Sequence, residues 1–395
     1  MKTDENLEEH ELITRYFKQG YTNDEIIEFL KLHNITISLA TLKRRLQTLK
    51  LSRRKKDADR INDDELRKAV EIELSGSGCF VGYRRMWARL KKKGILVKRS
   101  RVMTLLRELD PDGVESRKKK RLRRRAYSTK GPNYIWHIDG HDKLKPFGFS
   151  IHGCIDGFSR RLIWLEVNAT NKNPEVIAHY YLDAVKQIGG APQKIRSDDG
   201  SENSLIEAMH TYLCFTNSGN DNPNDSCFAI GRSTANQRIE AYWSHLVKDG
   251  PGWWIHFFKD LRDLNLFRDS DPLHIECIRF CFMQILRKEL HQVAELWNEH
   301  IISPSKFGNN SGPKGKPDCM FFLPHLYGTE NYQINIACDE LQEFDDAVMC
   351  PADVTDEFNE FATCVMDELG WQAPNNVKDA LDLYINLTKT IQELV

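Results

Sequence analysis

The sequence lacks the features of a secreted, disulfide-linked or membrane-spanning protein. Its ten cysteines are scattered along 395 residues, and no two of them form a CxxC pair. No apolar run approaches the roughly 18 residues that span a bilayer, and the N-terminus, MKTDENLEEHEL, is acidic and has no apolar stretch. These absences predict a reducing compartment, no secretory signal and no membrane partner. They also argue against a disulfide framework and against a zinc finger, because both need closely spaced cysteines.

The net charge of −1 hides an asymmetry along the chain. Residues 1–130 contain 34 Lys and Arg against 19 Asp and Glu, a net charge of +15. The remaining residues contain 56 − 34 = 22 basic and 57 − 19 = 38 acidic side chains, a net charge of −16. A basic front half indicates a polyanionic partner such as DNA or RNA, because phosphate neutralisation supplies most non-specific affinity for nucleic acid. Charge alone fits a solvated basic face equally well.

The first 50 residues carry the pattern of three short helices. Thr22–Glu25 is a capping box that opens the second helix, and Ser38 caps a third helix in which leucines repeat at helical spacing. The opposite face of that third helix carries four candidate DNA-contacting side chains, Lys43, Arg44, Gln47 and Lys50. This is the form of a helix-turn-helix whose third helix reads the major groove, although many small trihelical folds share it. We predict a DNA-binding domain at residues 1–55.

A second helical DNA-binding unit is predicted at residues 61–112, followed by a basic linker at residues 113–130. In the run RKKKRLRRR, eight of nine residues are basic, and like charges crowded to this density are costly without a polyanion nearby. The run predicts a DNA-contacting arm, a nuclear-import signal or both. Its candidate contacts are Arg117, Lys118, Lys119, Lys120, Arg121, Arg123, Arg124 and Arg125. We expect nuclear localisation, or the cytoplasm and nucleoid if the source is prokaryotic.

From residue 133 the pattern changes to alternating strands and helices. The predicted strands are Tyr134–Asp139, Ser150–Asp156, Leu162–Val167 and Gln193–Ser197, and the predicted helices are Pro174–Ile188, Ser204–Leu213 and Ser233–Val247. Three strands, a helix, a strand and then helices is an α/β order, in which ligands bind near strand ends. Residues 251–395 are predicted to be mainly helical, with one long helix over Ile275–Ile301.

Three acidic residues stand out because of their predicted positions. Asp139 ends the first strand, Asp198 ends the fourth strand, and Glu240 lies inside a helix. Carboxylates from two strand ends and one helix can converge on one cleft, and their oxygens suit Mg²⁺ or Mn²⁺. Two such ions can activate an attacking oxygen and stabilise a leaving oxygen at phosphorus. By contrast, His137 and His141 flank Asp139 on a strand, where this spacing does not converge, so structural roles are favoured for both.

At these residues the chain resembles the retroviral integrase and transposase superfamily that carries the DDE triad. Within it, the chain looks like bacterial insertion-sequence transposases and eukaryotic transposon-derived proteins with an integrase core. The matching stretches are GPNYIWHIDGHDKL, GCIDGFSRRLIWLEV, IRSDDGSEN and GRSTANQRIEAYW, which cover about residues 131–250. In the front half, GYRRMWARLKKKGILVKRSRV is similar to the helix-turn-helix region of those transposases. The resemblance implies a multidomain chain: all-α helix-turn-helix units, a central α/β RNase H-like catalytic core at residues 131–250, and a mainly helical region at residues 251–395.

The same resemblance implies an activity and a set of metal ligands. It implies a polynucleotidyl transferase that cuts transposon ends and joins their 3′-hydroxyls to target DNA as a homo-oligomer on double-stranded DNA. Two Mg²⁺ or Mn²⁺ ions would be held by Asp139, Asp198 and Glu240. In the family the second acidic residue stands two positions before a glycine, which selects Asp198 over Asp199. Two departures from the family are a longer interval between Asp198 and Glu240 and the lack of the zinc-binding His/Cys domain of retroviral integrases.

Two alternatives stay open at this point. One is a domesticated, transposase-derived protein that binds DNA but no longer transposes it. The other is an RNase H-like nuclease that only hydrolyses nucleic acid. An intact set of three carboxylates argues against decay, and only a strand-transferring enzyme would make joined products.

Overall fold

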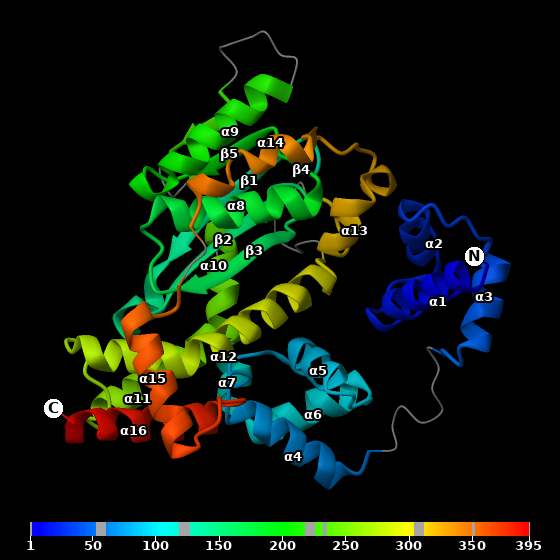
Figure 1. Ribbon diagram of the computed structural model, residues 1–395. Coiled ribbons are helices and arrows are strands. Elements are labelled where there is room, and N and C mark those ends of the chain that lie inside the picture. The colour runs from blue at the N-terminus through cyan, green and yellow to red at the C-terminus, as the bar shows by residue number, and fades with distance from the viewer. Residues whose placement is uncertain are drawn as a thin grey trace. The chain divides into compact units, whose positions relative to one another are not determined.

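The computed structural model describes residues 2–52, 61–117, 127–217, 226–231, 235–303, 312–349 and 352–394 (Figure 1). The chain forms two compact units. The first comprises Met1–Ser75, Val81–Ser128 and Asn298–Asn331, and the second comprises Gly76–Phe80, Thr129–Trp297 and Tyr332–Val395. The predicted ranges 131–250 and 251–395 therefore both contribute to the second unit. None of the described helices is long and apolar enough to span a bilayer.

The first unit begins with a three-helix group. Its helices are α1 (Lys2–Lys18), α2 (Asn23–Leu32) and α3 (Leu39–Thr48). The capping box predicted at Thr22 is present, and the Ser38 side chain accepts a hydrogen bond from the Thr41 backbone, so both helix starts are confirmed. Buried apolar side chains of the three helices share one core with Cys319 and Leu323, near α13 (Pro317–Phe322). A segment from late in the chain thus completes the core of the N-terminal helices.

A second helical group in the same unit has a core of its own. Its helices are α4 (Asp63–Leu74), α5 (Tyr83–Lys92), α6 (Arg99–Leu109) and α7 (Pro111–Ser116). Val70, Met86, Leu90 and Val102 are fully buried in this core. Glu73 is buried beside it, and its carboxylate accepts a hydrogen bond of 2.6 Å from Arg89, which stabilises the charge inside the unit.

The second unit contains a mixed sheet of five strands in the order β3-β2-β1-β5-β6. The strands are β1 (Ile135–His141), β2 (Ser150–Asp156), β3 (Leu162–Asn168), β5 (Lys194–Ser197) and β6 (Phe228–Ile230). The first three pair antiparallel, whereas β5 is parallel to β1 and β6 is parallel to β5. A short pair, β4 (Gly190–Ala191) with β7 (Ile334–Asn335), lies outside this sheet. The α/β core consistent with an RNase H-like fold is thereby confirmed, with helical regions before and after it.

Helices cover both faces of the five-stranded sheet (Figure 1). On one face, α8 (Pro174–Ile188) and α9 (Ser204–Asn217) enclose apolar side chains such as Trp136 and Ile138. The other face packs against α10 (Gln237–Asp249), α11 (Pro251–Asp263) and α12 (Pro272–Glu299), and the same core includes α15 (Asp356–Leu369) and α16 (Val377–Leu394). The last helices of the chain are therefore part of the body that holds the sheet.

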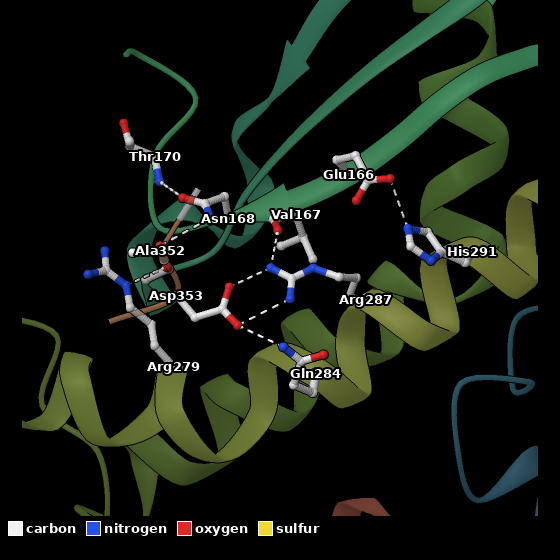
Figure 2. Close-up of polar contacts among 11 residues, drawn as sticks. Glu166, Val167, Asn168, Thr170, Arg279, Gln284, Arg287, His291, Ala352 and Asp353 are labelled. Carbon is white, nitrogen blue, oxygen red and sulfur yellow. Dashed lines mark hydrogen bonds and ion pairs between the residues drawn. The ribbon is translucent and has the colours of Figure 1, made fainter. Parts of the chain in front are cut away.

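Polar contacts fasten α12 to the edge strand β3 and to the segment around Asp353 (Figure 2). Arg287 forms a two-pronged contact with the Asp353 carboxylate and also donates to the Val167 carbonyl at 3.2 Å. Gln284 donates to the same carboxylate at 2.9 Å. One turn further along α12, His291 lies 2.9 Å from a Glu166 oxygen. We call Glu166, Gln284, Arg287, His291 and Asp353 the α12 clamp.

Two predicted positions need correction. Asp139 was predicted to end the first strand, but β1 continues to His141 because the ladder with β2 extends to the pair His141–Ile151. Lys50 was predicted on the third helix, but α3 ends at Thr48, and Lys50 has the left-handed backbone of a residue beyond a helix end (φ 53°). Three short strands, β4, β6 and β7, were not predicted, and they contain only two, three and two residues.

Candidate active site

The first predicted carboxylate, Asp139, lies in β1 opposite Gly153 of β2. The Trp243 indole of α10 donates a hydrogen bond of 2.7 Å to Asp139 Oδ2. Gly153 makes room for that indole, because a Cβ at this position would lie only 2.7 Å from Trp243 Cη2. The strand pairing and one aromatic side chain together fix the Asp139 carboxylate on the sheet face that α10 covers.

The second predicted carboxylate, Asp198, directly follows β5, the strand that pairs parallel with β1. Along this segment Ile195 and Ser197 are buried, Asp198 is half-buried and Asp199 is exposed. Because β1 and β5 run in the same direction side by side, Asp139 and Asp198 lie toward the carboxyl ends of two neighbouring strands. This placement supports the choice of Asp198 over Asp199 that the spacing to Gly200 suggested.

The third predicted carboxylate, Glu240, lies in the first turn of α10, three residues before Trp243. Residues three apart lie on the same side of a helix, so the indole that contacts Asp139 and the Glu240 carboxylate are neighbours. The start of α10 is pinned to β1 by Asn236, which is buried. Its amide donates to the Ile138 carbonyl at 2.8 Å, and its oxygen lies 2.7 Å from His137 Nδ1.

The charges of neighbouring carboxylates affect the pKa values of Asp139 and Glu240. Burial, together with the charges of Asp198 and Glu240, raises the pKa of Asp139 to about 7, although the Trp243 hydrogen bond opposes the shift. Glu240 is an exposed residue, yet partial desolvation of its carboxyl and the charge of Asp198 raise its pKa. The charges of Asp198 and Glu240 thus act on Asp139, although the three acidic residues are not a group whose ligand atoms all lie within 4.8 Å of one another.

Such a set of groups fits a divalent cation. Carboxylates are the hard oxygen ligands that Mg²⁺ and Mn²⁺ prefer. The raised pKa of Asp139 means that ionisation of this carboxyl lowers the free energy of unfolding. A bound cation would remove the repulsion that causes part of that loss. Asp139, Asp198 and Glu240 are therefore the residues that would hold the predicted ions.

The two histidines that flank Asp139 have packing roles. His137 is fully buried, and burial lowers its pKa to about 3. His141 is also buried, its ring lies 5.1 Å from that of Trp243, and burial lowers its pKa to about 4. Both side chains are neutral near pH 7. They hold α10 and Trp243 against β1, in keeping with the structural roles that their positions on a strand favoured.

One cation near the site was not found from the sequence. Lys172 precedes α8, and its ammonium donates to a Glu202 oxygen at 2.6 Å. That hydrogen bond raises the pKa of Lys172, and the charges of Asp142 and Asp198 add to the effect. No motif surrounds Lys172, so only the folded chain reveals that a lysine lies within the field of Asp198.

The predicted DNA-contacting residues that the structure describes lie in the first unit. Lys43, Arg44 and Gln47 are exposed on α3 beside its buried leucines, and Lys50 is exposed after the helix end. Arg117 donates to an Asp110 oxygen at 3.0 Å. The rest of the basic run, Lys118, Lys119, Lys120, Arg121, Arg123, Arg124 and Arg125, lies outside the described residues. The contacts of all these residues with DNA stay predictions.

Comparison with known proteins adds a family match for the middle of the chain. Residues 126–313 match the family model of the integrase core domain. No curated protein matches the chain. Among solved structures, it is similar to a chain of the simian T-cell lymphotropic virus intasome in complex with the PP2A regulatory subunit B56 gamma, at 15% sequence identity. That match covers 64% of this chain and 74% of the other with a TM-score of 0.29, too low to establish a common fold.

Proposed function

Residues 126–313 are an integrase core domain of the DDE integrase-like superfamily, and on this premise we propose that the chain cuts DNA ends and joins them to a second DNA. The reaction is metal-dependent polynucleotidyl transfer at phosphorus, with Asp139, Asp198 and Glu240 as the metal ligands. The observation that carries the proposal is the placement of these three acidic residues: on β1, directly after its parallel neighbour β5, and in the first turn of α10, whose Trp243 is hydrogen-bonded to Asp139. The raised pKa of the buried Asp139 agrees with this placement, since acids with raised pKa values often mark functional sites.

Each residue of the site has a separate task in this proposal. Bound Mg²⁺ or Mn²⁺ supplies charge neutralisation at phosphorus and a more acidic attacking oxygen. Trp243 holds Asp139 in one orientation through its hydrogen bond, and Asn236 holds the first turn of α10 so that Glu240 faces the same edge. Lys172 can neutralise a phosphate oxygen beside Asp198, because its ammonium already lies within that field.

The helical units supply the DNA contacts in this proposal. Residues 1–130 carry a net charge of +15, and exposed Lys43, Arg44 and Gln47 lie on the face of α3 that would enter the major groove. Proteins that join two DNA ends hold both at once, so we propose a homo-oligomer on double-stranded DNA. We further propose nuclear localisation, for which the basic run at residues 117–125 is the supporting feature.

The test is single-turnover cleavage and strand transfer by the purified chain with Mg²⁺, using the ends of its own element as substrate. Asp198→Asn should lower both rates by about 1,000-fold or more, since a lost metal ligand removes several kcal/mol of transition-state stabilisation. Asp199→Asn is the matched control, because it removes an exposed neighbouring charge, and it should keep most activity. Circular dichroism establishes that both variants fold.

Three outcomes would contradict the proposal. Robust cleavage in EDTA would exclude metal-dependent transfer. Hydrolysis without joined products, even from pre-cut ends, would indicate a nuclease, and tight DNA binding without either reaction would indicate a domesticated binding protein. An active Asp198→Asn beside an inactive Asp199→Asn would move the second ligand to Asp199.

A further inference from the structure

A second group of metal-ligating side chains lies away from the three carboxylates. His210 and Cys214 of α9 and Cys227, directly before β6, place one ligand atom each within 4.8 Å of the other two. The sequence contains no CxxC pair and predicted no zinc finger. We propose that these three residues bind a Zn²⁺ ion.

The backbone brings the three residues together through two different elements. His210 and Cys214 are four residues apart on α9, so they lie on the same side of the helix. Cys227 is held at the sheet because its carbonyl accepts a hydrogen bond of 2.8 Å from the Ile195 backbone of β5. The ligands thus connect a helix to the edge of the sheet, on either side of residues 218–225.

The orientation of His210 suits a ligand. Its Nδ1 lies 2.9 Å from the hydroxyl oxygen of the buried Tyr181, and its Nε2 lies 3.4 Å from Cys214 Sγ. Metal-binding histidines commonly use one ring nitrogen for the metal and the other for such an outer contact. Tyr181 therefore leaves Nε2, which faces Cys214 Sγ, available for a metal.

The distances also suit one tetrahedral ion. Zinc binds sulfur at about 2.3 Å and imidazole nitrogen at about 2.0 Å, which places neighbouring ligand atoms about 3.5–4 Å apart. Ligand atoms already within 4.8 Å of one another need only small rotations to reach those positions. His210 and Cys214 are buried, whereas Cys227 is half-buried, so the fourth position is open to water from the Cys227 side.

The chemistry of the group selects zinc over the ions proposed for the active site. Thiolate and imidazole ligands suit Zn²⁺, whereas Mg²⁺ and Mn²⁺ prefer carboxylate oxygens. The ligands must be a neutral imidazole and two thiolates. Burial lowers the pKa of His210 to about 3, and the hydrogen bond between the two thiols lowers the pKa of Cys227 to about 6. The same hydrogen bond, together with burial, raises the pKa of Cys214 well above its usual range, so this thiol must release a proton when zinc binds. The geometry, and not these shifts, carries the inference.

The ion would act as a structural tie between α9 and the edge of the sheet. β5, to which Cys227 is bonded, leads directly into Asp198. Zinc would therefore fix the position of that strand end without contacting the reacting groups. This role is independent of the proposed activity, because it needs neither DNA nor the three carboxylates.

Metal content and cobalt spectra test the site directly. The full chain is purified under reducing conditions, its zinc is measured by plasma mass spectrometry, and the stripped protein is titrated with Co²⁺. We expect one zinc per chain and a near-ultraviolet thiolate-to-cobalt charge-transfer band, which carboxylate ligands do not produce. Cys227→Ser should lose both signals, and its thermal midpoint should no longer rise on addition of Zn²⁺. Cys79→Ser, a half-buried cysteine outside the group, is the matched control and should keep both.

Several outcomes would overturn the site. One is a reduced wild-type chain with neither zinc nor the cobalt–thiolate band. Another is a Cys227→Ser variant, folded by circular dichroism, that keeps the full zinc content. If Cys227→Ser does not fold, Cys214→Ala and His210→Ala take its place, and retention of zinc in either is equally decisive against the site. A Cys214–Cys227 disulfide in the reduced protein, detected by mass spectrometry, would also contradict it.

Discussion

Two sets of acidic residues in the second unit differ in what surrounds them. Asp139 and Glu240 have acidic neighbours, and burial together with the charges of those neighbours raises the pKa values of both. In the α12 clamp, Asp353 faces Arg287 and Glu166 faces His291. The hydrogen bond to Asp353 raises the pKa of Arg287 against the effect of burial. Acidic side chains thus lower the stability of the fold where their neighbours are acidic, and raise it where their neighbours are basic.

This difference indicates which set is functional. Partly buried pairs of opposite charge are ordinary structural contacts, because each charge stabilises the other. A cluster of like charges lowers stability in the absence of a ligand, so selection for folding alone would not keep it. The comparison therefore predicts opposite effects when an acid is neutralised in each set.

The largest effect on stability is expected in the clamp. Asp353→Ala should lower the free energy of unfolding of the second unit by about 2–3 kcal/mol, because it leaves the partly buried Arg287 guanidinium without its carboxylate. Urea unfolding followed by tryptophan fluorescence measures this, since every tryptophan except Trp87 lies in the second unit. Asp382→Ala, an exposed position on α16, is the control and should change stability by less than about 0.5 kcal/mol. Equal losses of stability in Asp353→Ala and Asp382→Ala would show that the pair of Asp353 and Arg287 does not stabilise the fold.

A smaller effect on stability, of opposite sign, is expected among the three carboxylates of Asp139, Asp198 and Glu240. Without metal, Asp139→Asn should raise the free energy of unfolding by about 1–2 kcal/mol at pH 8, since a tenfold change in an acid dissociation constant corresponds to about 1.4 kcal/mol. The pKa of Asp139 is about 7 in the folded chain and near 3.8 when unfolded. The folded state therefore binds more protons, and the wild type loses stability as pH rises from about 4 to about 7.

The pH dependence separates charge from other effects of Asp139→Asn. The gain should be largest above pH 7 and should shrink as pH falls toward 4, because the wild-type carboxyl then becomes neutral in both states. Asn keeps an oxygen that can accept the Trp243 hydrogen bond. A gain that does not change with pH, or a loss of stability at pH 8, would show that repulsion in the cluster is not what this substitution relieves.

The smallest effect is expected from His291. Its hydrogen bond with the Glu166 carboxylate raises the pKa of His291, against the effect of burial. A raised folded pKa adds stability below the unfolded value of about 6.5, and this stability is lost as pH rises through the folded value. Because both side chains are partly exposed, we expect His291→Gln to cost about 0.5 kcal/mol at pH 6 and almost nothing at pH 9. Urea midpoints that differ from wild type equally at both pH values would refute a charged pair.

Much of the core could be predicted because its main strands and helices are long enough to be recognised between turn residues. The range predicted for β2 and that for α8 agree with the structure, and the predicted long helix corresponds to α12 (Pro272–Glu299). The three shortest strands, β4, β6 and β7, could not be predicted, because two or three residues carry no periodicity. The position of the last two helices could not be predicted either. Their apolar faces show that they pack against something, but not against which element. The structure shows them in the same core as the sheet.

The sequence could propose the residues of the candidate site but not their surroundings. Asp139, Asp198 and Glu240 stay predicted ligands, and the topology places the first two in or directly after neighbouring parallel strands. The donor to Asp139 was missed because Trp243 looked like one more apolar residue of a helix. Lys172 and the group of His210, Cys214 and Cys227 depend on contacts between separate elements. Sequence spacing alone cannot reveal such contacts.

The candidate site should be sensitive to substitution of Gly153, a residue that takes no part in the chemistry. Gly153 carries no functional group, yet any added side chain would collide with Trp243, and Trp243 is the donor that holds Asp139. A substitution there would have to displace the indole or bend β2, and either change releases the carboxylate. In a mutational scan for activity, position 153 should therefore be nearly as intolerant as position 139, with alanine already harmful. The room that Gly153 leaves for the Trp243 ring is as much a part of the site as the charged groups around it.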